Sequence, residues 1–285
     1  MTSAPEDATR RTFDAAAADF TALGHHLWGP IGAATVRAAG PRAGDRVLDA
    51  CCGTGASAIL AADLVGADGA VDAVDMSRPM IDELRRQSRG RPQLRAHQAD
   101  VTAWDADSYD LVECALGIFF FPDMAAGTER LIAMARPGGR VALTIWRGEA
   151  MQAAGRHLGR AVAAATGAPP PEEREPHLID RINQPDSYAA WLTGRGLCGV
   201  EVLEHELSLT MTPDLAWLVI TGSGFRGAIA DLDPGTVESV RRHYLDFLRV
   251  DGLTELDATT LIGMGTARGI RAGSPPAHPA PPAGR

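Results

Sequence analysis

The most informative stretch of this chain is Arg46-Val-Leu-Asp-Ala-Cys-Cys-Gly-Thr-Gly55, which is followed by Val71-Asp-Ala-Val-Asp75. Its apolar residues, glycines and spacing predict a strand, a tight turn, a helix and a second strand that ends in a carboxylate. In such a unit, backbone N–H groups at the turn approach a bound ligand closely, while the acid accepts hydrogen bonds from a ribose diol. The pattern therefore indicates a ligand that contains a nucleoside.

The glycines alone do not choose between two such ligands. Gly53-Thr-Gly55-Ala-Ser-Ala58 fits the dinucleotide pattern G-x-G-x-x-A, and Asp75 lies at the spacing expected for the ribose of NAD. Asp49 favours another ligand, because a carboxylate at the end of the first strand repels a pyrophosphate and attracts a cation. S-adenosylmethionine has a sulfonium and an ammonium group and no phosphate, so it suits an acidic turn better. The alternative is that Asp49 only caps the turn.

Two later strands end in residues suited to an adenosyl group. Leu94-Arg-Ala-His-Gln-Ala-Asp100 is predicted to be a strand whose final acid accepts a hydrogen bond from an adenine amino group. The backbone N–H of Val101 can donate to a ring nitrogen. Tyr109-Asp-Leu-Val-Glu-Cys-Ala115 is the next expected strand. Since open α/β sheets bind ligands at the carboxyl ends of their strands, these residues are expected to line one site.

These motifs resemble those of the class I S-adenosylmethionine-dependent methyltransferases, in particular the ubiquinone/menaquinone biosynthesis methyltransferase type. The resemblance covers roughly residues 20–147, and it includes His25-His-Leu-Trp28 and Arg136-Pro-Gly-Gly-Arg-Val141. It implies that S-adenosylmethionine is the cofactor. The cofactor-binding residues that it implies are Trp28, Asp49, Cys51, Gly53, Thr54, Gly55, Asp75, Met76, Asp100, Val101 and Ala115.

The chain departs from this family at two positions. Cys51 stands where the turn usually has its first glycine, so the backbone there is expected to avoid positive φ. Phe20 stands where many members have a tyrosine that touches the cofactor carboxylate, and it has no hydroxyl group. The cofactor's tail must therefore be held in another way.

Composition excludes several classes of function. All 27 basic residues are arginine, since the sequence has no lysine, and the formal net charge is −9. The missing lysine excludes a P-loop and Schiff-base chemistry, and the acidic balance argues against nucleic acid as a partner. The four cysteines form no C-x-x-C pair, so neither a metal site nor a disulfide framework is expected. No run suits a membrane span or a signal peptide, which predicts a cytoplasmic protein, and a homodimer is compatible with these features.

Strands and helices alternate between residues 46 and 146, which predicts an α/β fold. The expected architecture is a doubly wound, Rossmann-like sheet of seven mostly parallel strands with helical cap insertions. Residues 1–40 are expected to form an N-terminal helical lid. Residues 41–270 would form the methyltransferase domain, with cap insertions near 148–180 and 212–250, and residues 271–285 would form a disordered tail.

Three local features are also expected. The first helix is predicted to end in a turn at Trp28-Gly-Pro30. The proline-rich residues 168–174 read as an exposed loop, and residues 199–209 as one continuous strand.

Aromatic residues in the lid and the insertions favour a hydrophobic small molecule as the substrate. Methyl transfer from a sulfonium needs positioning and exclusion of water, and for some acceptors a general base. Six histidines are candidates for such a base: His25, His26, His157, His177, His205 and His243. His25 is preferred because it matches the family's histidine. The lysine-free, alanine-rich composition is associated with specialised metabolism in GC-rich bacteria.

Two other classes of function remain open at this point. A nicotinamide-dependent oxidoreductase would use the same glycine turn. A cyclase or a non-catalytic binding protein of the methyltransferase fold would keep the cofactor pocket and lose methyl transfer. The sequence names neither the substrate nor the atom that accepts the methyl group.

Overall fold

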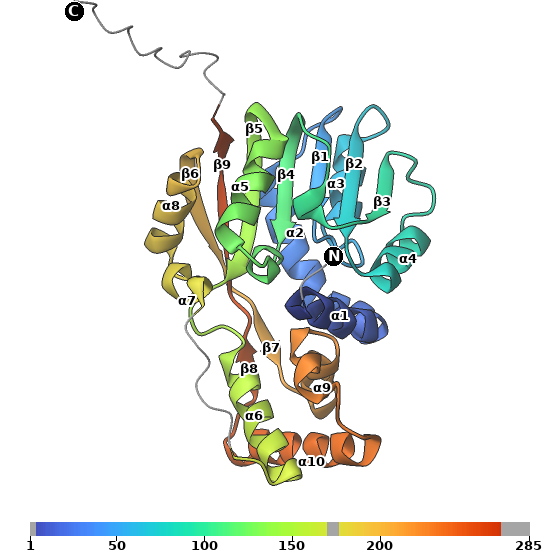
Figure 1. The fold of residues 1–285 in the computed structure, drawn as a ribbon, viewed down its shortest axis with the longest axis vertical. Helices are drawn as coiled ribbons and strands as arrows, with labels where there is room; N and C mark the ends of the chain where they lie inside the picture. The colour runs from blue at the N-terminus through green and yellow to red at the C-terminus, as the bar shows by residue number, and fades with distance from the viewer. Residues whose placement is uncertain (1–3, 170–176, 269–285) are drawn as a thin grey trace, which may run out of the picture.

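The computed structural model describes residues 4–169 and 177–268, built around a sheet of seven strands (Figure 1). The strand order is β3-β2-β1-β4-β5-β9-β6. The first five of these strands are parallel, and β9 runs antiparallel to both of its neighbours. This is the expected doubly wound arrangement. The strands are β1 (Arg46–Ala50), β2 (Ala70–Asp75), β3 (Leu94–Gln98), β4 (Tyr109–Ala115), β5 (Ala135–Trp146), β6 (Leu197–His205), β7 (Ser208–Thr210), β8 (Glu255–Asp257) and β9 (Thr260–Ala267).

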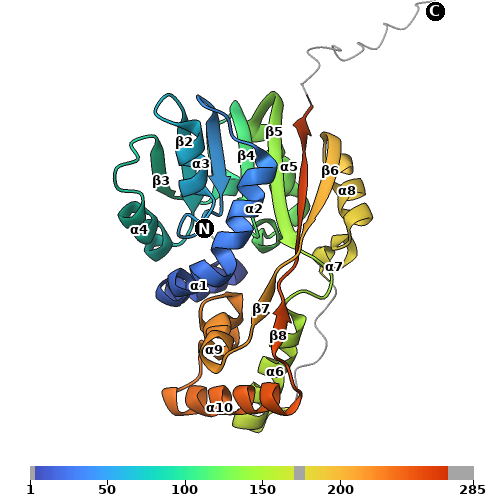
Figure 2. The same ribbon diagram turned by 180° about the vertical axis from the view of Figure 1, so that it is seen from behind.

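Helices cover both faces of the sheet. The α-helices are α1 (Ala4–Leu23), α2 (Gly29–Ala39), α3 (Ala58–Val65), α4 (Arg78–Gln87), α5 (Met124–Met134), α6 (Gln152–Thr166), α7 (Leu178–Ile182), α8 (Pro185–Gly194), α9 (Pro213–Thr221) and α10 (Pro234–Val250). Side chains of α2, α3 and α4 share one buried apolar cluster with the sheet, and those of α5 and α8 share another on the opposite face (Figure 2). The chain changes face between β1 and β4, where doubly wound folds bind their ligands.

The N-terminal segment forms continuous helical structure, so the prediction of a turn at Trp28-Gly-Pro30 is wrong. Gly24–Trp28 is a π-helix that joins α1 directly to α2. Pro30 has no N–H group, yet its fixed φ suits the first turn of α2. A π turn contains one residue more than a turn of α-helix. Here the N–H of Gly29 donates to the carbonyl of Gly24, five residues earlier.

The segment predicted as one strand over residues 199–209 is two strands. β6 ends at His205, and β7 leaves the large sheet to pair with β8 in a separate two-stranded sheet. The predicted loop at 168–174 lies partly, and the predicted tail at 271–285 wholly, outside the described residues.

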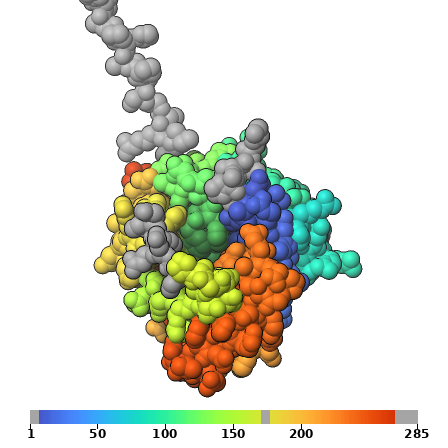
Figure 3. Space-filling model, turned by 60° about the horizontal axis from the view of Figure 1, so that its bottom comes forward, coloured from blue at the N-terminus to red at the C-terminus, as the bar shows by residue number. Residues whose placement is uncertain are grey.

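The elements between β5 and β9 that leave the sheet form a cap. We use "cap" for α6, β7, α9, the 3-10 helix Gly224–Ile229 (η4), α10 and β8, which lie together below the sheet in Figure 1. The cap has its own buried cluster, which includes Leu158, Ile220, Val240 and Tyr244. Helix α1 lies between sheet and cap and contacts both α9 and η4; Figure 3 shows the orange part of the cap against blue α1.

Residues 4–169 and 177–268 contain neither a candidate membrane-spanning helix nor a candidate metal centre. No helix there is both long enough and apolar enough to cross a membrane. Nor do these residues bring together three or more histidine, cysteine, aspartate or glutamate side chains that could hold a metal ion.

Candidate active site

A cavity of about 720 Å³ lies at the carboxyl ends of β1, β2, β4 and β5. The residues that line the cavity belong to the sheet, to α1 and to the cap. The cavity therefore forms only when these three parts of the molecule pack together. The volume lies within the range of small-molecule and cofactor sites. Eight of the eleven predicted cofactor residues line it: Trp28, Cys51, Gly53, Asp75, Met76, Asp100, Val101 and Ala115.

The glycine turn begins with a left-handed residue, so the prediction that Cys51 avoids positive φ is wrong. Cys51 has a φ of 56° and Gly53 a φ of 52°. The tight reversal lets Cys52 donate its N–H to the carbonyl of Val74, on the neighbouring strand. A left-handed residue other than glycine costs roughly 1–2 kcal/mol, which the surrounding contacts must offset.

The Cys51 side chain is held by the residues around it. Its thiol is hydrogen-bonded with the thiol of Cys114, and this contact together with burial holds the pKa of Cys51 well above its ordinary value. A Cβ atom on Gly117 would lie only 2.5 Å from Cys51 Cβ, so the glycine at 117 makes room for the cysteine at 51. Cys51 therefore presents a neutral thiol to the cavity.

Asp75 joins the end of β2 to the turn. One carboxylate oxygen accepts from the N–H of Gly53 at 2.9 Å, and the other accepts from the N–H of Ser77 at 2.8 Å. Burial raises the pKa of Asp75, and these two hydrogen bonds lower it in part. Each oxygen has a further lone pair, so the side chain can still accept from two hydroxyl groups of a ligand in the cavity.

Asp100 is fixed in the same manner at the end of β3. Its Oδ1 atom accepts from both the backbone N–H and the hydroxyl of Thr102, each at 2.8 Å. Oδ2 has no protein partner in these contacts. Asp100 and Val101 are thus placed side by side on the cavity wall, next to Met76 and Asp75.

Three of the predicted cofactor residues do not line the cavity. Thr54 and Gly55 lie behind the turn, where Gly55 donates its N–H to the carbonyl of Cys52. A Cβ atom on Gly55 would lie 2.3 Å from a methyl carbon of Leu84, so this glycine is needed for packing. Asp49 is fully buried and accepts from the Ser57 hydroxyl at 2.6 Å. Its position below the turn differs from the direct contact that the sequence suggested.

His25 lies away from the cavity. It is exposed, and together with His26 it lines a separate hollow beside β7 and α9. In an α-helix, residues 25 and 28 would share a face, but the π turn between them changes the phase of the side chains. Trp28 consequently faces the cavity while His25 faces out. None of the histidines in residues 4–169 and 177–268 lines the cavity.

The aromatic side chains of the N-terminal segment close one side of the cavity. Phe20 stacks on Trp28, with ring centroids 4.6 Å apart and planes 14° apart. A Cβ atom on Gly53 would be 3.2 Å from the Phe20 ring, so the ring rests on the turn. The buried Nε1 of Trp28 has no hydrogen-bond partner in the part of the chain that the structure describes. An N–H donor is thus left free beside the turn.

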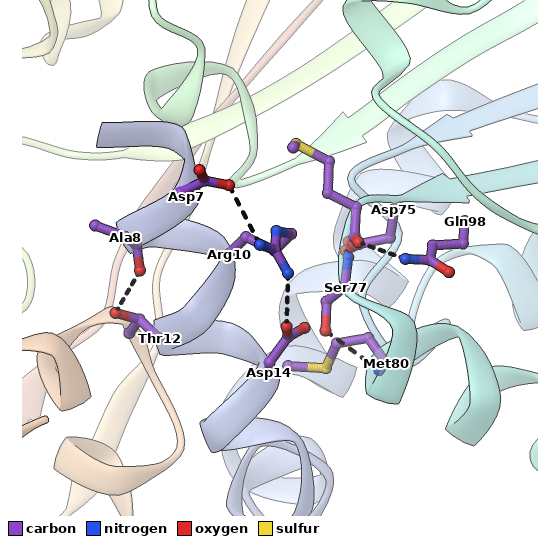
Figure 4. A network of polar contacts seen from close by, with 10 residues as sticks. Asp7, Ala8, Arg10, Thr12, Asp14, Asp75, Ser77, Met80 and Gln98 are labelled. Carbon is purple, nitrogen blue, oxygen red and sulfur yellow. Dashed lines mark hydrogen bonds and ion pairs between the residues drawn. The ribbon is translucent and has the colours of Figure 1, made fainter. Parts of the chain in front are cut away.

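Arg10 was not singled out by the sequence. It lies on α1 between Asp7 and Asp14, on the side that faces Asp75 and Ser77 (Figure 4). The nearby charge of Asp14 also contributes to the raised pKa of Asp75. Arg10 can be recognised as a site residue only from its position in the fold, because an arginine in an N-terminal helix belongs to no sequence motif.

The opposite end of the cavity is mainly apolar. Phe13 of α1 meets Phe120 edge-on, with ring centroids 5.2 Å apart, and Phe120 meets Phe119 at 4.7 Å. Trp146, Met151, Ile179 and Phe225 extend this wall, and Gln152 and Asn183 are among its few polar members. Ile179 and Asp180 of α7 lie in the insertion predicted near 148–180, whereas the segment 119–121 was missed by the sequence analysis, since its apolar residues are also typical of a core.

Comparison with known proteins agrees with this geometry. Residues 47–139 match a family described as methyltransferase domain. The matched segment runs from β1 to the start of β5 and contains the glycine turn. The lining residues suit S-adenosylmethionine better than a dinucleotide, because the sheet end offers Asp75 and Asp100, and Arg10 is the one basic residue among the described residues that line the cavity.

Three relatives illustrate the match. Aklanonic acid methyltransferase DauC from Streptomyces sp. (strain C5) is 33% identical over 47% of this chain and 63% of its own. Nocamycin O-methyltransferase from Saccharothrix syringae is 32% identical over 46% of this chain and 49% of its own. Demethylmenaquinone methyltransferase from Clavibacter sepedonicus is 35% identical over 39% of this chain and 44% of its own. The chain thus spans about half the length of the curated relatives that it matches.

Solved structures show the same fold. The YcgJ protein from Bacillus subtilis has a TM-score of 0.56 and 18% identity, over 83% of this chain and 97% of its own. The [4+2]-cyclase SpnF has a TM-score of 0.54 and 14% identity, over 86% of this chain and 85% of its own. At these identities the similarity concerns the fold alone.

Proposed function

We propose that the protein transfers a methyl group from S-adenosylmethionine to a hydrophobic small molecule in the biosynthesis of a natural product. The observation that carries this proposal is one cavity with two chemically different ends. The end at β1–β4 offers carboxylates and the turn, whereas the end at the cap offers aromatic rings. The names of the relatives from Streptomyces and Saccharothrix support the class of acceptor.

The residues present suggest how the cofactor is held. Asp75 would accept from both ribose hydroxyls, as its two free lone pairs allow. Asp100 and Val101 would contact the adenine ring beside Met76. The turn at Cys51 and Gly53 would hold the methionine tail. Trp28, with its unpartnered Nε1, would donate to the tail's carboxylate and so replace the hydroxyl that Phe20 lacks.

When bound, the cofactor supplies an activated methyl group on a sulfonium. The protein's own part is to position the acceptor in line with that methyl and to exclude water. Helix α1 would exclude water, because Phe13, Phe20 and Arg10 cover the cavity from one side. We propose catalysis mainly by positioning, which the location of His25 outside the cavity supports.

The proposal also covers the location, the partners and the oligomeric state of the protein. A cytoplasmic location is part of the proposal, and the four free cysteines are compatible with such a reducing compartment. The net charge of −9 argues against nucleic acid as a partner. A homodimer stays a prediction that a measurement of mass in solution would test.

Binding and turnover test the proposed function separately. Calorimetry should show that S-adenosylmethionine and S-adenosylhomocysteine bind and that NADH does not. Incubation with aromatic metabolites and S-adenosylmethionine should then add the mass of one methylene group to an acceptor. A metabolite that binds and is converted without gaining this mass would favour a cyclase, and absence of cofactor binding would refute the proposal.

A further inference from the structure

Two carboxyl groups lie side by side under the glycine turn, within the core. Asp49 of β1 and Glu113 of β4 are register partners on adjacent parallel strands, and both are 0% exposed. Their side chains therefore point to the same face of the sheet, the one covered by α2 and α3. The sequence analysis assigned no role to Glu113, because this residue lies in the middle of a predicted, mainly apolar strand.

No basic group balances this pair. Both oxygens of Glu113 and one oxygen of Asp49 have no hydrogen-bond partner among residues 4–169 and 177–268. The flanking strands place Ala73 of β2 and Ala142 of β5 beside the two acids. The polar groups that stabilise the pair lie at the start of α3, where the Ser57 hydroxyl donates to Asp49 and the backbone N–H of Ala58 also favours the Asp49 carboxylate.

The other titratable groups around the pair are acids or thiols. Asp75 at the end of β2, Cys52 in the turn and Cys114 on β4 act on one or both carboxyls through their charge or potential charge. Helix α3 contributes Ser57 and the N–H of Ala58, and β5 contributes the neutral Thr144. The charged residue of α2 is Arg37, which is exposed at its last turn. Two buried like charges this close cannot both persist, so at least one carboxyl is neutral.

The charge of the cofactor changes during methyl transfer. S-adenosylmethionine has a positive sulfonium, and when its carbon–sulfur bond breaks, the electron pair stays on sulfur and leaves a neutral thioether. S-adenosylhomocysteine therefore carries one positive charge less. The turn residues Cys51 and Gly53, which directly follow the Asp49 strand, line the cofactor end of the cavity. Asp49 also interacts electrostatically with Asp75, which lines this end of the cavity, so a charge on the pair acts on a cofactor bound there.

We propose, on the basis of the proposed function, that Asp49 and Glu113 hold at most one negative charge between them and that this charge follows that of the cofactor. Binding of S-adenosylmethionine expels a proton from the pair. After methyl transfer the neutral product no longer stabilises the charge, so the proton returns and the product is held less tightly. Glu113 stays neutral throughout, and Asp49 is the group that titrates.

The directions of the pKa shifts agree with this assignment. Burial raises the pKa of Asp49 to about 7, and it raises the pKa of Glu113 well above its ordinary value. The hydrogen bond from Ser57 lowers the pKa of Asp49, which explains why the charge resides on Asp49 when the pair ionises.

Calorimetry in two buffers of different ionisation enthalpy measures the protons released on binding. At pH 7, S-adenosylmethionine should release about half a proton, and S-adenosylhomocysteine clearly less. Asp49→Asn should abolish the difference and weaken S-adenosylmethionine about tenfold more than the product. Equal proton counts for the two ligands, or an unchanged difference in the variant, would overturn the proposal.

Two further variants keep the test decisive if Asp49→Asn does not fold. Ser57→Ala removes the hydroxyl that stabilises the Asp49 carboxylate, so proton release should shift to higher pH. Glu113→Gln, which keeps the shape and the neutral state, should leave the proton release in place. Loss of the release in Glu113→Gln would mean that Glu113 is the titrating group, which contradicts the assignment.

Infrared spectroscopy of the protein without ligand tests the pair independently of the proposed function. The carbonyl stretch of a protonated carboxyl group should be present at pH 7 and decrease in Glu113→Gln. If the difference spectrum contains only the signal of an ionised carboxylate, the pair is not as proposed. If S-adenosylmethionine does not bind, the proposed function and the linkage both fail, while the infrared result still decides the state of the pair.

Discussion

The two ends of the cavity differ in how they are built. At the sheet end, strand termini and a turn fix Asp75 and Asp100 through backbone N–H groups at 2.8–2.9 Å. At the cap end, the wall consists mainly of aromatic and aliphatic side chains, among which Phe120 meets Phe13 edge-on and Phe119 at a tilt. A hydrogen-bonded end selects one ligand closely, whereas an apolar end tolerates changes in its residues and in its ligand. The difference suggests that the cofactor is fixed by the fold and the acceptor by the insertions.

Stability should respond most strongly at the sheet end, through the buried acids. The pKa of Asp49 is raised from 3.8 to about 7, so between these values the folded protein holds a proton that the unfolded chain has lost. Stability must therefore fall as pH rises through this window, by on the order of 4 kcal/mol at most for this group. Urea unfolding between pH 4 and 8 should show this slope, and Asp49→Asn should reduce it. A slope unchanged in the variant would exclude Asp49 as its source.

Removing the ribose acceptor should damage only the cofactor end. Asp75→Ala should weaken S-adenosylmethionine by about 2–3 kcal/mol, because two charge-assisted hydrogen bonds are lost. Calorimetry measures this change, and circular dichroism checks that the fold is kept. Asp82→Ala on the exposed side of α4 is a matched control, since Asp82 only joins surface ion pairs with Arg78 and Arg85. An unchanged affinity of Asp75→Ala for S-adenosylmethionine would show that Asp75 does not bind the ribose.

A substitution at the cap end should affect the acceptor alone. Phe120 is 41% exposed and contacts Phe13, so Phe120→Ala should cost little stability. We expect the KM for an identified acceptor to rise about tenfold, as lost aromatic contacts are worth roughly 1 kcal/mol or more. The Kd of S-adenosylmethionine should stay constant. Equal changes in both constants would show that the two ends are not independent.

The N-terminal segment joins the two ends, and we predict that it acts as a lid. Hydrogen exchange of residues 10–35 should become slower when S-adenosylhomocysteine binds, because α1 packs over the cavity and segments of this kind open most readily. Exchange in α8, which lies on the far face of the sheet, serves as the internal control. Identical exchange of residues 10–35 with and without ligand would refute the lid.

The smallest effect is expected at His25. Since this residue lines a separate hollow, His25→Ala should change kcat less than about twofold, within the range of a surface substitution. His26→Ala provides the matched control, because His26 lines the same hollow. A drop of a hundredfold in kcat for His25→Ala, with an unchanged Kd for the cofactor, would restore the histidine as a base and require the segment to rearrange.

Much of the sheet end could be predicted from the sequence. The bounds of β2, β4, α9 and α10 agree with those expected, since apolar periodicity and Gly or Pro at the ends act over a few residues. The places of Asp75 and Asp100 at strand ends followed from the same local pattern. The split of β6 and β7 did not, because β7 is defined by its partner β8, which comes about 45 residues later in the chain.

The sequence by itself determined the alternating core, its turn and the acids at the strand ends, because each of these depends on neighbours in the chain. The tertiary structure decided which way several side chains point. The π turn rotates His25 outward, the turn after β1 holds Cys51 in a left-handed conformation beside Gly117, and strand register brings Glu113 beside Asp49. The tertiary structure also determined the cap end of the cavity. Its walls come from segments that are far apart in the chain and form one surface only when they pack together.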